Sequence, residues 1–117
     1  MKRSYILYLH DIVTSIEKIR NYTEGLSYEE FVQSAMVLDA VVRNLEIIGE
    51  ASGHIPESTQ KAFPQVPWRL MKSMRNILIH EYFGVDYEIL WKTVQESLPA
   101  LLEALRQALH SASDQSS

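Results

Sequence analysis

Three polar side chains of complementary chemistry lie within the largely apolar segment Met71–Trp91. Arg75 carries a permanent charge and a fork of donors that suits a phosphate group. His80 follows five residues later and can exchange protons near neutral pH, and Tyr82 comes two residues after it. No other segment combines a phosphate-binding group with a proton-transfer group at so short a spacing. Any chemistry is therefore expected at this segment.

Helical geometry restricts how these residues can cooperate. At about 100° per residue, Arg75 and His80 diverge by about 140° on a regular helix, whereas Arg75 and Tyr82 lie nearly on one line. Either the helix ends or distorts near His80, or two copies of the chain face each other and share one site. Asn76 and Glu81 flank the motif as further polar contacts.

A purely structural interpretation of the same residues is also open. Arg75 could form a salt bridge with a carboxylate on the second helix. A histidine near the C-terminus of a helix is electrostatically favourable without any function. Polar clusters are often structural, so the spacing alone is a weak signal and favours the structural interpretation.

Length and composition favour one globular domain. The chain has 117 residues, 46% of them hydrophobic and 22% charged, which suits a single core. The absence of cysteine excludes disulfides and zinc–thiolate sites and fits a reducing cytosol. Tyr8, His10 and Asp11 interrupt the first apolar run, so we reject a targeting signal, and no segment approaches a membrane span. We expect a cytoplasmic protein.

The formal net charge of −4 limits how the protein could contact nucleic acid. Any such contact must be local, through a small basic patch. Arg69, Lys72 and Arg75 recur every three residues, with Lys61 upstream, and could form a ridge that follows phosphates. A solvated helix face is an equal alternative. The histidines show no i, i+4 pair, so we expect no metal and no cofactor.

Apolar periodicity predicts an all-α fold, an up-and-down antiparallel bundle of four to five helices. The expected helices cover residues 3–21, Ser27 to about Gly53, Pro67 or Trp68 to about Tyr82, and Asp86 onward, with a short helix possible over 57–63. Pro99 predicts a kink or a break near Glu96–Leu98. The domain should span residues 1–110, and the small polar residues 111–117 predict a flexible tail.

The predicted second helix has a start signal of its own and carries a charged stripe. Ser27 and Glu30 form a capping-box pattern. A charged stripe on the second helix is favoured as a solvated face, and the alternative is a polar groove beside the Arg75–His80 segment. Its residues are Asp39, Arg43, Glu46 and Glu50. On the predicted second and last helices the apolar surface is wider than one stripe and includes Val41, Ile47 and Leu102. Such a surface predicts a homodimer.

The string RNILIHEY at residues 75–82 fits the pattern R-x4-H-x-Y. It resembles the signature of the HEPN superfamily, and specifically of its small HepT-like toxin proteins. Further strings are similar to that family, and the likeness covers most of residues 3–106. These strings are RNLEIIGEAS at 43–52, VPW at 66–68 and VDYEILW at 85–91.

The resemblance implies a metal-independent endoribonuclease, the homodimeric toxin of a toxin–antitoxin pair, that cleaves RNA such as tRNA or mRNA. Arg75 would bind the scissile phosphate and His80 would be the general acid or base, with Asn76 and Tyr82 in support. Tyr82 would also accept AMP from the partner antitoxin, a minimal nucleotidyltransferase. The added negative charge would repel RNA phosphate.

Two other functions fit the same fold. The chain could be a non-catalytic helical binding module that docks a nucleotidyltransferase partner, or a free-standing antitoxin-like or regulatory dimer. The presence of Arg75, His80 and Tyr82 together favours the ribonuclease.

Overall fold

The computed structural model describes residues 4–81 and 86–115, with side chains for all of these except 75–81 and 112–115. Every regular element in these ranges is helical, which confirms the all-α prediction. In chain order the elements are α1 (Tyr5–Thr23), α2 (Tyr28–Gln33), α3 (Ala35–Ser52), α4 (Glu57–Ala62), α5 (Trp68–Glu81), α6 (Tyr87–Lys92), the π-helical segment η1 (Thr93–Ser97) and α7 (Leu98–Gln115).

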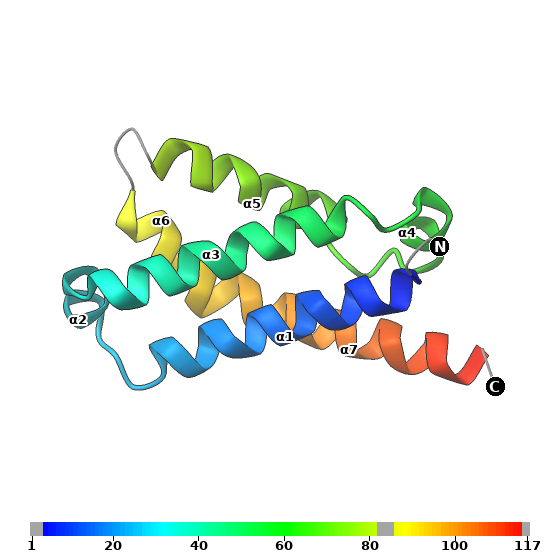
Figure 1. Ribbon diagram of the computed structural model, residues 1–117. Coiled ribbons are helices and arrows are strands. Elements are labelled where there is room, and N and C mark those ends of the chain that lie inside the picture. Colours follow the sequence, from blue (N-terminus) through cyan, green and yellow to red (C-terminus); the bar gives the residue numbers. More distant parts are fainter. Residues whose placement is uncertain (1–3, 82–85, 116–117) are drawn as a thin grey trace.

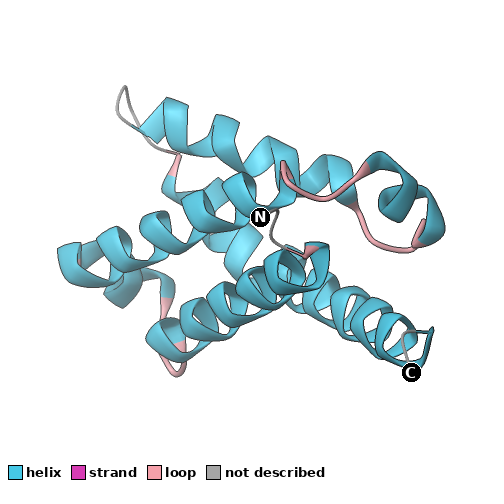
Figure 2. Cartoon of the chain, turned by 45° about the vertical axis from the view of Figure 1, so that its right-hand side comes forward, coloured by secondary structure: helices cyan, strands magenta, loops and turns pink. Residues whose placement is uncertain are grey.

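The four long helices α1, α3, α5 and α7 form the bundle, and the chain reverses direction between each of them and the next (Figure 1). α3 lies between α1 and α5 and packs against both, while α1 also packs against α7. Figure 2 shows that α1 and α7 cross at an open angle rather than running parallel. The up-and-down antiparallel arrangement is confirmed.

The core is built from the apolar stripes that the sequence pattern predicts. Fully buried side chains come from α1, α3, α5 and α7, and each contributes about 1.5–3 kcal/mol by leaving water. Examples are Ile12 and Ile16 of α1, Leu45 and Ile48 of α3, Met71 and Met74 of α5, and Leu101 and Leu105 of α7. Met71 and Met74 thus hold the N-terminal half of α5 against the core and determine which side of this helix faces inward.

The prediction of one continuous helix from Ser27 to Gly53 is wrong, because the helix is interrupted at Ser34. This residue has extended backbone angles and is at once the C-cap of α2 and the N-cap of α3. Its hydroxyl accepts a hydrogen bond from the backbone N–H of Val37 at 3.2 Å. Such a side-chain cap competes with helix continuation, and here it prevails. The break lets α2 turn so that Phe31 is fully buried.

Other predicted helix boundaries are confirmed. Ser27 and Glu30 form the capping box, with hydrogen bonds of 3.2 and 2.9 Å. Asp86 caps α6, since its carboxylate accepts from the N–H groups of Glu88 and Ile89. α3 ends at Ser52 with Gly53 as its C-cap.

The effect of Pro99 appears as a π-helical segment between α6 and α7. Proline has no N–H, so it cannot donate to the Gln95 carbonyl four residues earlier. Just before it, the N–H of Leu98 reaches five residues back to the Thr93 carbonyl. The wider turn absorbs the missing bond without a break in the chain of helices. α7 then continues to Gln115, so the backbone is helical five residues into the predicted tail.

Two of the three residues from which a wide apolar surface was predicted do not lie at the surface. Val41 and Leu102 are 0% and 1% exposed, so the core of a single chain already covers them. Ile47 is half-buried. These side chains therefore leave no apolar surface that needs a second copy, and the homodimer stays a prediction.

Candidate functional site

The start of α5 is fixed by Trp68. Its indole N–H donates to the carbonyl oxygens of Gln60 and Phe63, at 3.0 and 3.1 Å, and so ties α5 to the end of α4. Met71 and Met74 are both 0% exposed and fix the rotation of the helix. The position of each later residue along α5 follows from this anchoring.

The predicted site residues Arg75, Asn76 and His80 all lie on the backbone of α5, whereas Tyr82 lies outside the described residues. α5 is an α-helix through both Arg75 and His80 and ends only at Glu81. The two positions are therefore about 7.5 Å apart along the axis and about 140° apart around it. The helix is therefore regular between Arg75 and His80 and ends at Glu81, one residue after His80.

α2 and α6, which contact each other, form an acidic surface at the end of the bundle toward which α5 runs (Figure 1). Partial burial, followed by the carboxylates of Glu88, Asp86 and Glu29, raises the pKa of Tyr28 above its ordinary value. The ring of Tyr28 lies 6.1 Å from that of Trp91. The carboxylates of Glu29, Asp86 and Glu88 are all exposed at this end, so the end carries negative charge.

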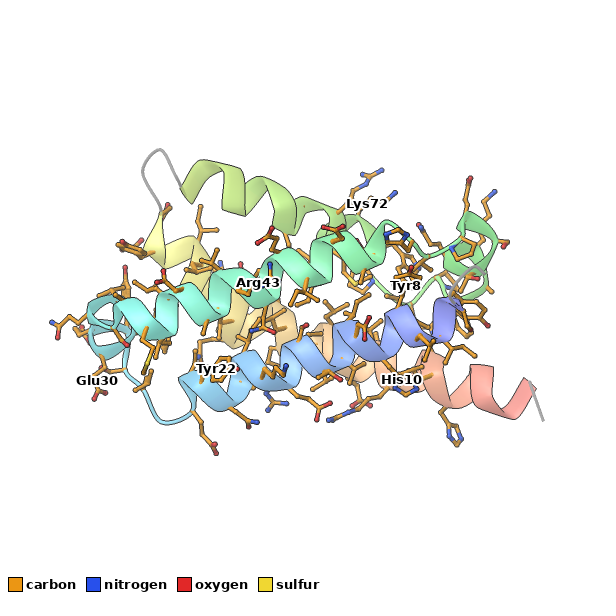
Figure 3. All side chains as sticks on the ribbon, viewed as in Figure 1. Tyr8, His10, Tyr22, Glu30, Arg43 and Lys72 are labelled. Atoms are coloured by element: carbon orange, nitrogen blue, oxygen red, sulfur yellow. The ribbon has the colours of Figure 1, made fainter. Side chains whose placement is uncertain are left out.

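The near end of α5 carries basic side chains. Lys61, Arg69 and Lys72 are all exposed, and Figure 3 shows Lys72 on this half of the helix. Lys61 forms an exposed ion pair of 3.5 Å with Glu57. Within the described part of the chain, neither Arg69 nor Lys72 forms an ion pair. A surface that attracts anions therefore precedes the Arg75–His80 segment.

The charged stripe of α3 is a solvated face, as favoured, since Asp39, Arg43, Glu46 and Glu50 are all exposed. Arg43 and Glu46 form an ion pair of 3.8 Å. Three of the four residues also line a groove of about 360 Å³ between α3 and α1. Its lining comprises Tyr8, Asp11, Arg43, Glu46, Ile47, Glu50, Ala51 and His54.

This groove was not predicted from the sequence. The alternative considered for the charged stripe was a polar groove beside the Arg75–His80 segment, not one beside α1. Tyr8 and His54 stack at one side of it, with ring centroids 4.6 Å apart. Tyr8 lies in α1 and His54 in the turn after α3, and no local sequence signal pairs them. α1 and α5 lie on either side of α3, so this groove opens on the α1 side (Figure 1).

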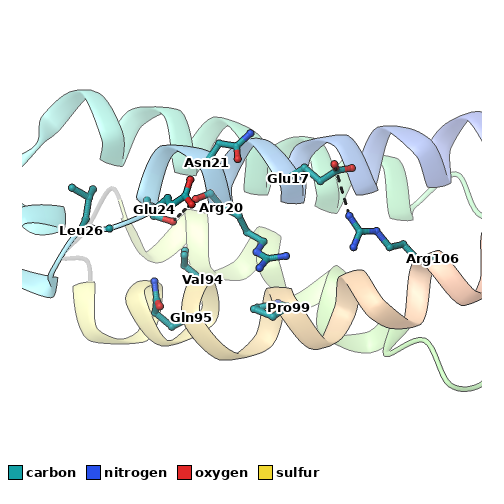
Figure 4. A pocket seen from close by; sticks show the side chains of 11 residues that line it. Glu17, Arg20, Asn21, Glu24, Leu26, Val94, Gln95, Pro99 and Arg106 are labelled. Carbon is teal, nitrogen blue, oxygen red and sulfur yellow. Dashed lines mark hydrogen bonds and ion pairs between the residues drawn. The ribbon is translucent and has the colours of Figure 1, made fainter.

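A second groove of about 450 Å³ lies between α1 and the η1–α7 region (Figure 4). Arg20 and Arg106 reach into it, together with the carboxylates of Glu17 and Glu24. Arg106 approaches Glu17 at 3.9 Å. Since two positive and two negative side chains line it, this groove carries no net attraction for phosphate.

Among the residues described, no three His, Cys, Asp or Glu side chains are grouped so that they could hold a metal ion. In the same part of the chain, none of the helices has the length and apolar character needed to cross a membrane.

Comparison with known proteins gives the family. The model of the family described as Ribonuclease HepT-like matches residues 12–108. A protein of Thermococcus cleftensis named probable ribonuclease HepT is 50% identical over 101 residues, which cover 86% of this chain and 92% of that protein.

Two further relatives carry names as candidate RNases. One, from Methanocaldococcus jannaschii, is 46% identical over 100 residues, 86% of this chain and 92% of that protein. The other, from Caldanaerobacter subterraneus, is 39% identical over 102 residues, 87% of this chain and 91% of that protein. No solved structure matches the chain significantly. The family match spans the motif at 75–82 and most of the bundle, and this chain therefore belongs to the HepT-like ribonuclease family.

Proposed function

We propose that this chain is a metal-independent endoribonuclease, the toxin of a toxin–antitoxin pair, and that two copies share each active site. The observation that carries the proposal is the complete R-x4-H-x-Y motif in the sequence, with Arg75 and His80 on one anchored helix, inside the region that matches a ribonuclease family. The names of the relatives agree with RNA as the substrate.

The reaction follows from the chemistry of two residues. His80 takes the proton of the ribose 2′-hydroxyl, and the 2′-oxygen attacks the adjacent phosphorus. The bond from phosphorus to the 5′-oxygen breaks, and that oxygen takes up the proton that His80 has gained, so the products are a 2′,3′-cyclic phosphate and a 5′-hydroxyl. Arg75 binds the phosphate and stabilises its developing charge, with Asn76 as a polar support. A catalytic metal stabilises charge and activates the nucleophile, and in this proposal Arg75 and His80 do the same without one.

The continuity of α5 is the argument for a shared site. Because Arg75 and His80 diverge by about 140° on one helix, a single chain does not turn both toward one phosphate. In a two-fold symmetric dimer each copy meets the same surface of the other, so Arg75 of one copy and His80 of its partner converge twice.

Tyr82 is the proposed point of control. In this proposal a minimal nucleotidyltransferase antitoxin transfers AMP from ATP to its hydroxyl, which loses its proton, and pyrophosphate leaves. The added phosphate brings negative charge and bulk to the motif and repels the RNA backbone. The modified protein is then a silent form of the toxin.

The experiment compares the purified wild type with a His80→Ala variant on total tRNA and on mRNA, in excess EDTA. Cleavage by the wild type alone supports a metal-independent ribonuclease that uses His80. Cleavage by both proteins contradicts the role of His80 and indicates a contaminant or another site.

If neither protein cleaves, the mass of the wild type distinguishes two cases. An added AMP on Tyr82 identifies a silenced toxin. An unmodified chain contradicts the ribonuclease proposal and favours the non-catalytic module that docks a nucleotidyltransferase.

A further inference from the structure

The charges of this acidic protein are distributed unevenly along the sequence. Between residues 53 and 75, four of the five charged side chains are basic. Between residues 24 and 39 all four charged side chains are acidic, and between 81 and 96 four of five are acidic. The basic stretch comprises α4 and the N-terminal half of α5, while the two acidic stretches contain α2 and α6.

The fold places these stretches at opposite ends of α5. α4 and the start of α5 lie together at one end of the bundle, and α2 and α6 lie at the other (Figure 1). The contact between α2 and α6 brings the exposed carboxylates of the two helices to the same end of the bundle. The Arg75–His80 segment therefore lies between a basic and an acidic end.

We infer that RNA reaches the Arg75–His80 segment along the N-terminal half of α5, where Arg69 and Lys72 contact its phosphates, and that the α2–α6 end repels it. This inference rests on the proposed ribonuclease function. Arg69 and Lys72 are positioning residues in it, since they hold the strand and take no part in bond breaking.

The geometry of α5 supports this path. Arg69 and Lys72 precede Arg75 by about 9 and 4.5 Å along the helix axis. Met71 and Met74 occupy the inward side of α5, and Arg69 and Lys72 are exposed. Neither makes an ion pair within the described residues, so their charge is available to a phosphate.

Other arginines are poorer candidates for the same task. Arg106 and Arg43 face Glu17 and Glu46 in ion pairs of 3.9 and 3.8 Å. Arg20 shares its groove with both Glu17 and Glu24. An RNA strand at these places would meet carboxylates as well as guanidinium groups. The exposed half of α5 offers phosphate the more favourable surface.

The test measures binding of a fluorescently labelled single-stranded oligouridylate by anisotropy over a range of salt concentrations. The starting protein is His80→Ala, so that the RNA stays intact. Adding Lys72→Ala or Arg69→Ala should weaken binding several-fold at low salt. Each should also lower the slope of log affinity against log salt by about 0.7, the share of one phosphate contact on a single strand.

Matched controls separate a local contact from the general loss of charge. Lys18→Ala on α1 and Lys92→Ala on α6 remove the same charge from exposed positions elsewhere. Both should leave the salt slope unchanged. Circular dichroism checks that each variant keeps its helices.

Three results would overturn the inference. If Lys72→Ala and Arg69→Ala behave like the controls while the wild type still cleaves RNA, the path is wrong and the ribonuclease stands. If Arg20→Ala or Arg106→Ala lowers the slope instead, the RNA lies in the α1–α7 groove. If the wild type neither binds nor cleaves RNA, the proposed function fails, and the inference fails with it.

Discussion

Single side chains decide where the helices of this bundle start, and the site depends on one of them. Trp68 holds the first turn of α5 by donating one N–H to two carbonyl oxygens, those of Gln60 and Phe63. Arg75 and His80 take their places along the helix from this anchor. The capping residues Ser27 and Glu30 do the same for α2.

Replacing Trp68 by phenylalanine should destabilise the protein by about 1–2 kcal/mol, because the donor is lost and two carbonyl groups lose their partner. The change keeps an aromatic ring for packing, so the helix content of the folded state should be preserved. Urea unfolding followed by circular dichroism measures the loss. An unchanged unfolding midpoint would show that the indole N–H does not anchor α5.

The capping box predicts a pH dependence at Glu30. Hydrogen bonds from the backbone and then from the side chain of Ser27 lower the pKa of this carboxyl below its ordinary value of 4.5. A lowered pKa in the folded state means that the cap stabilises the protein above pH 4.5 and that this contribution is lost as the pH falls through the folded value.

An NMR titration of the Glu30 carboxyl carbon checks this prediction. In Ser27→Ala the side-chain part of the cap is absent, so the pKa of Glu30 should move upward, toward its ordinary value. The backbone part remains, so the shift should be incomplete. An identical titration in the two proteins would contradict the capping geometry.

At the scale of whole elements, the break at Ser34 and the π-helical segment shape the bundle. Ser34 ends α2 and starts α3 with one side chain. η1 joins α6 to α7 through a wider helical turn, so that α7 follows α6 without a break in the helical backbone. Both are local departures from a regular helix.

Ser34→Ala tests the first of them. Loss of the hydroxyl that accepts the Val37 N–H should cost about 1 kcal/mol, the usual value of an N-cap, measured by urea unfolding. The helix content should not increase, since burial of Phe31 keeps α2 turned inward. Higher helicity without loss of stability would mean that α2 and α3 can merge.

The helix boundaries that the sequence predicts correctly are those signalled by neighbouring residues. Asp86, Gly53 and the Ser27–Glu30 pair are caps with their own chemistry, and the structure confirms them. The break at Ser34 was missed because the apolar periodicity continues through Phe31, Ala35 and Leu38. A serine inside such a pattern is compatible with a continuous helix and with a helix break. The packing of Phe31 in the core decides for the break.

The candidate site was predictable only in part for a similar reason. The motif places Arg75, Asn76 and His80 on one helix, which the structure confirms. Which surfaces surround that helix depends on helix pairing, and the pairing of α1 with α3 and α7 has no signal in a short window of sequence. The two grooves beside α1 were therefore missed.

At the scale of the whole molecule, a shared active site makes a prediction about mixed dimers. Arg75→Ala and His80→Ala should each be inactive alone. In a mixed dimer one site carries both substitutions and the other carries neither, so an equal, fully exchanged mixture should recover roughly a quarter of wild-type activity.

The measurement is RNA cleavage by the two variants before and after their subunits are mixed by mild denaturation and refolding. A mixture as inactive as its components would mean that each chain builds its site alone or that the copies do not exchange. Size-exclusion chromatography of a tagged and an untagged variant reports the exchange directly. Exchange without recovered activity would rule out the shared site.

The separation of basic and acidic stretches along α5 gives the molecule an electric dipole, although its total charge is negative. A polyanion repels such a molecule at long range and turns it as it approaches. Encounters that begin with the α2–α6 end are therefore brief, and those that begin with the start of α5 last longer. Salt at about 0.1 M screens charges that are more than about 10 Å apart, so it weakens both the long-range repulsion and the turning of the molecule. Collisions with the polyanion then become more frequent but less well oriented.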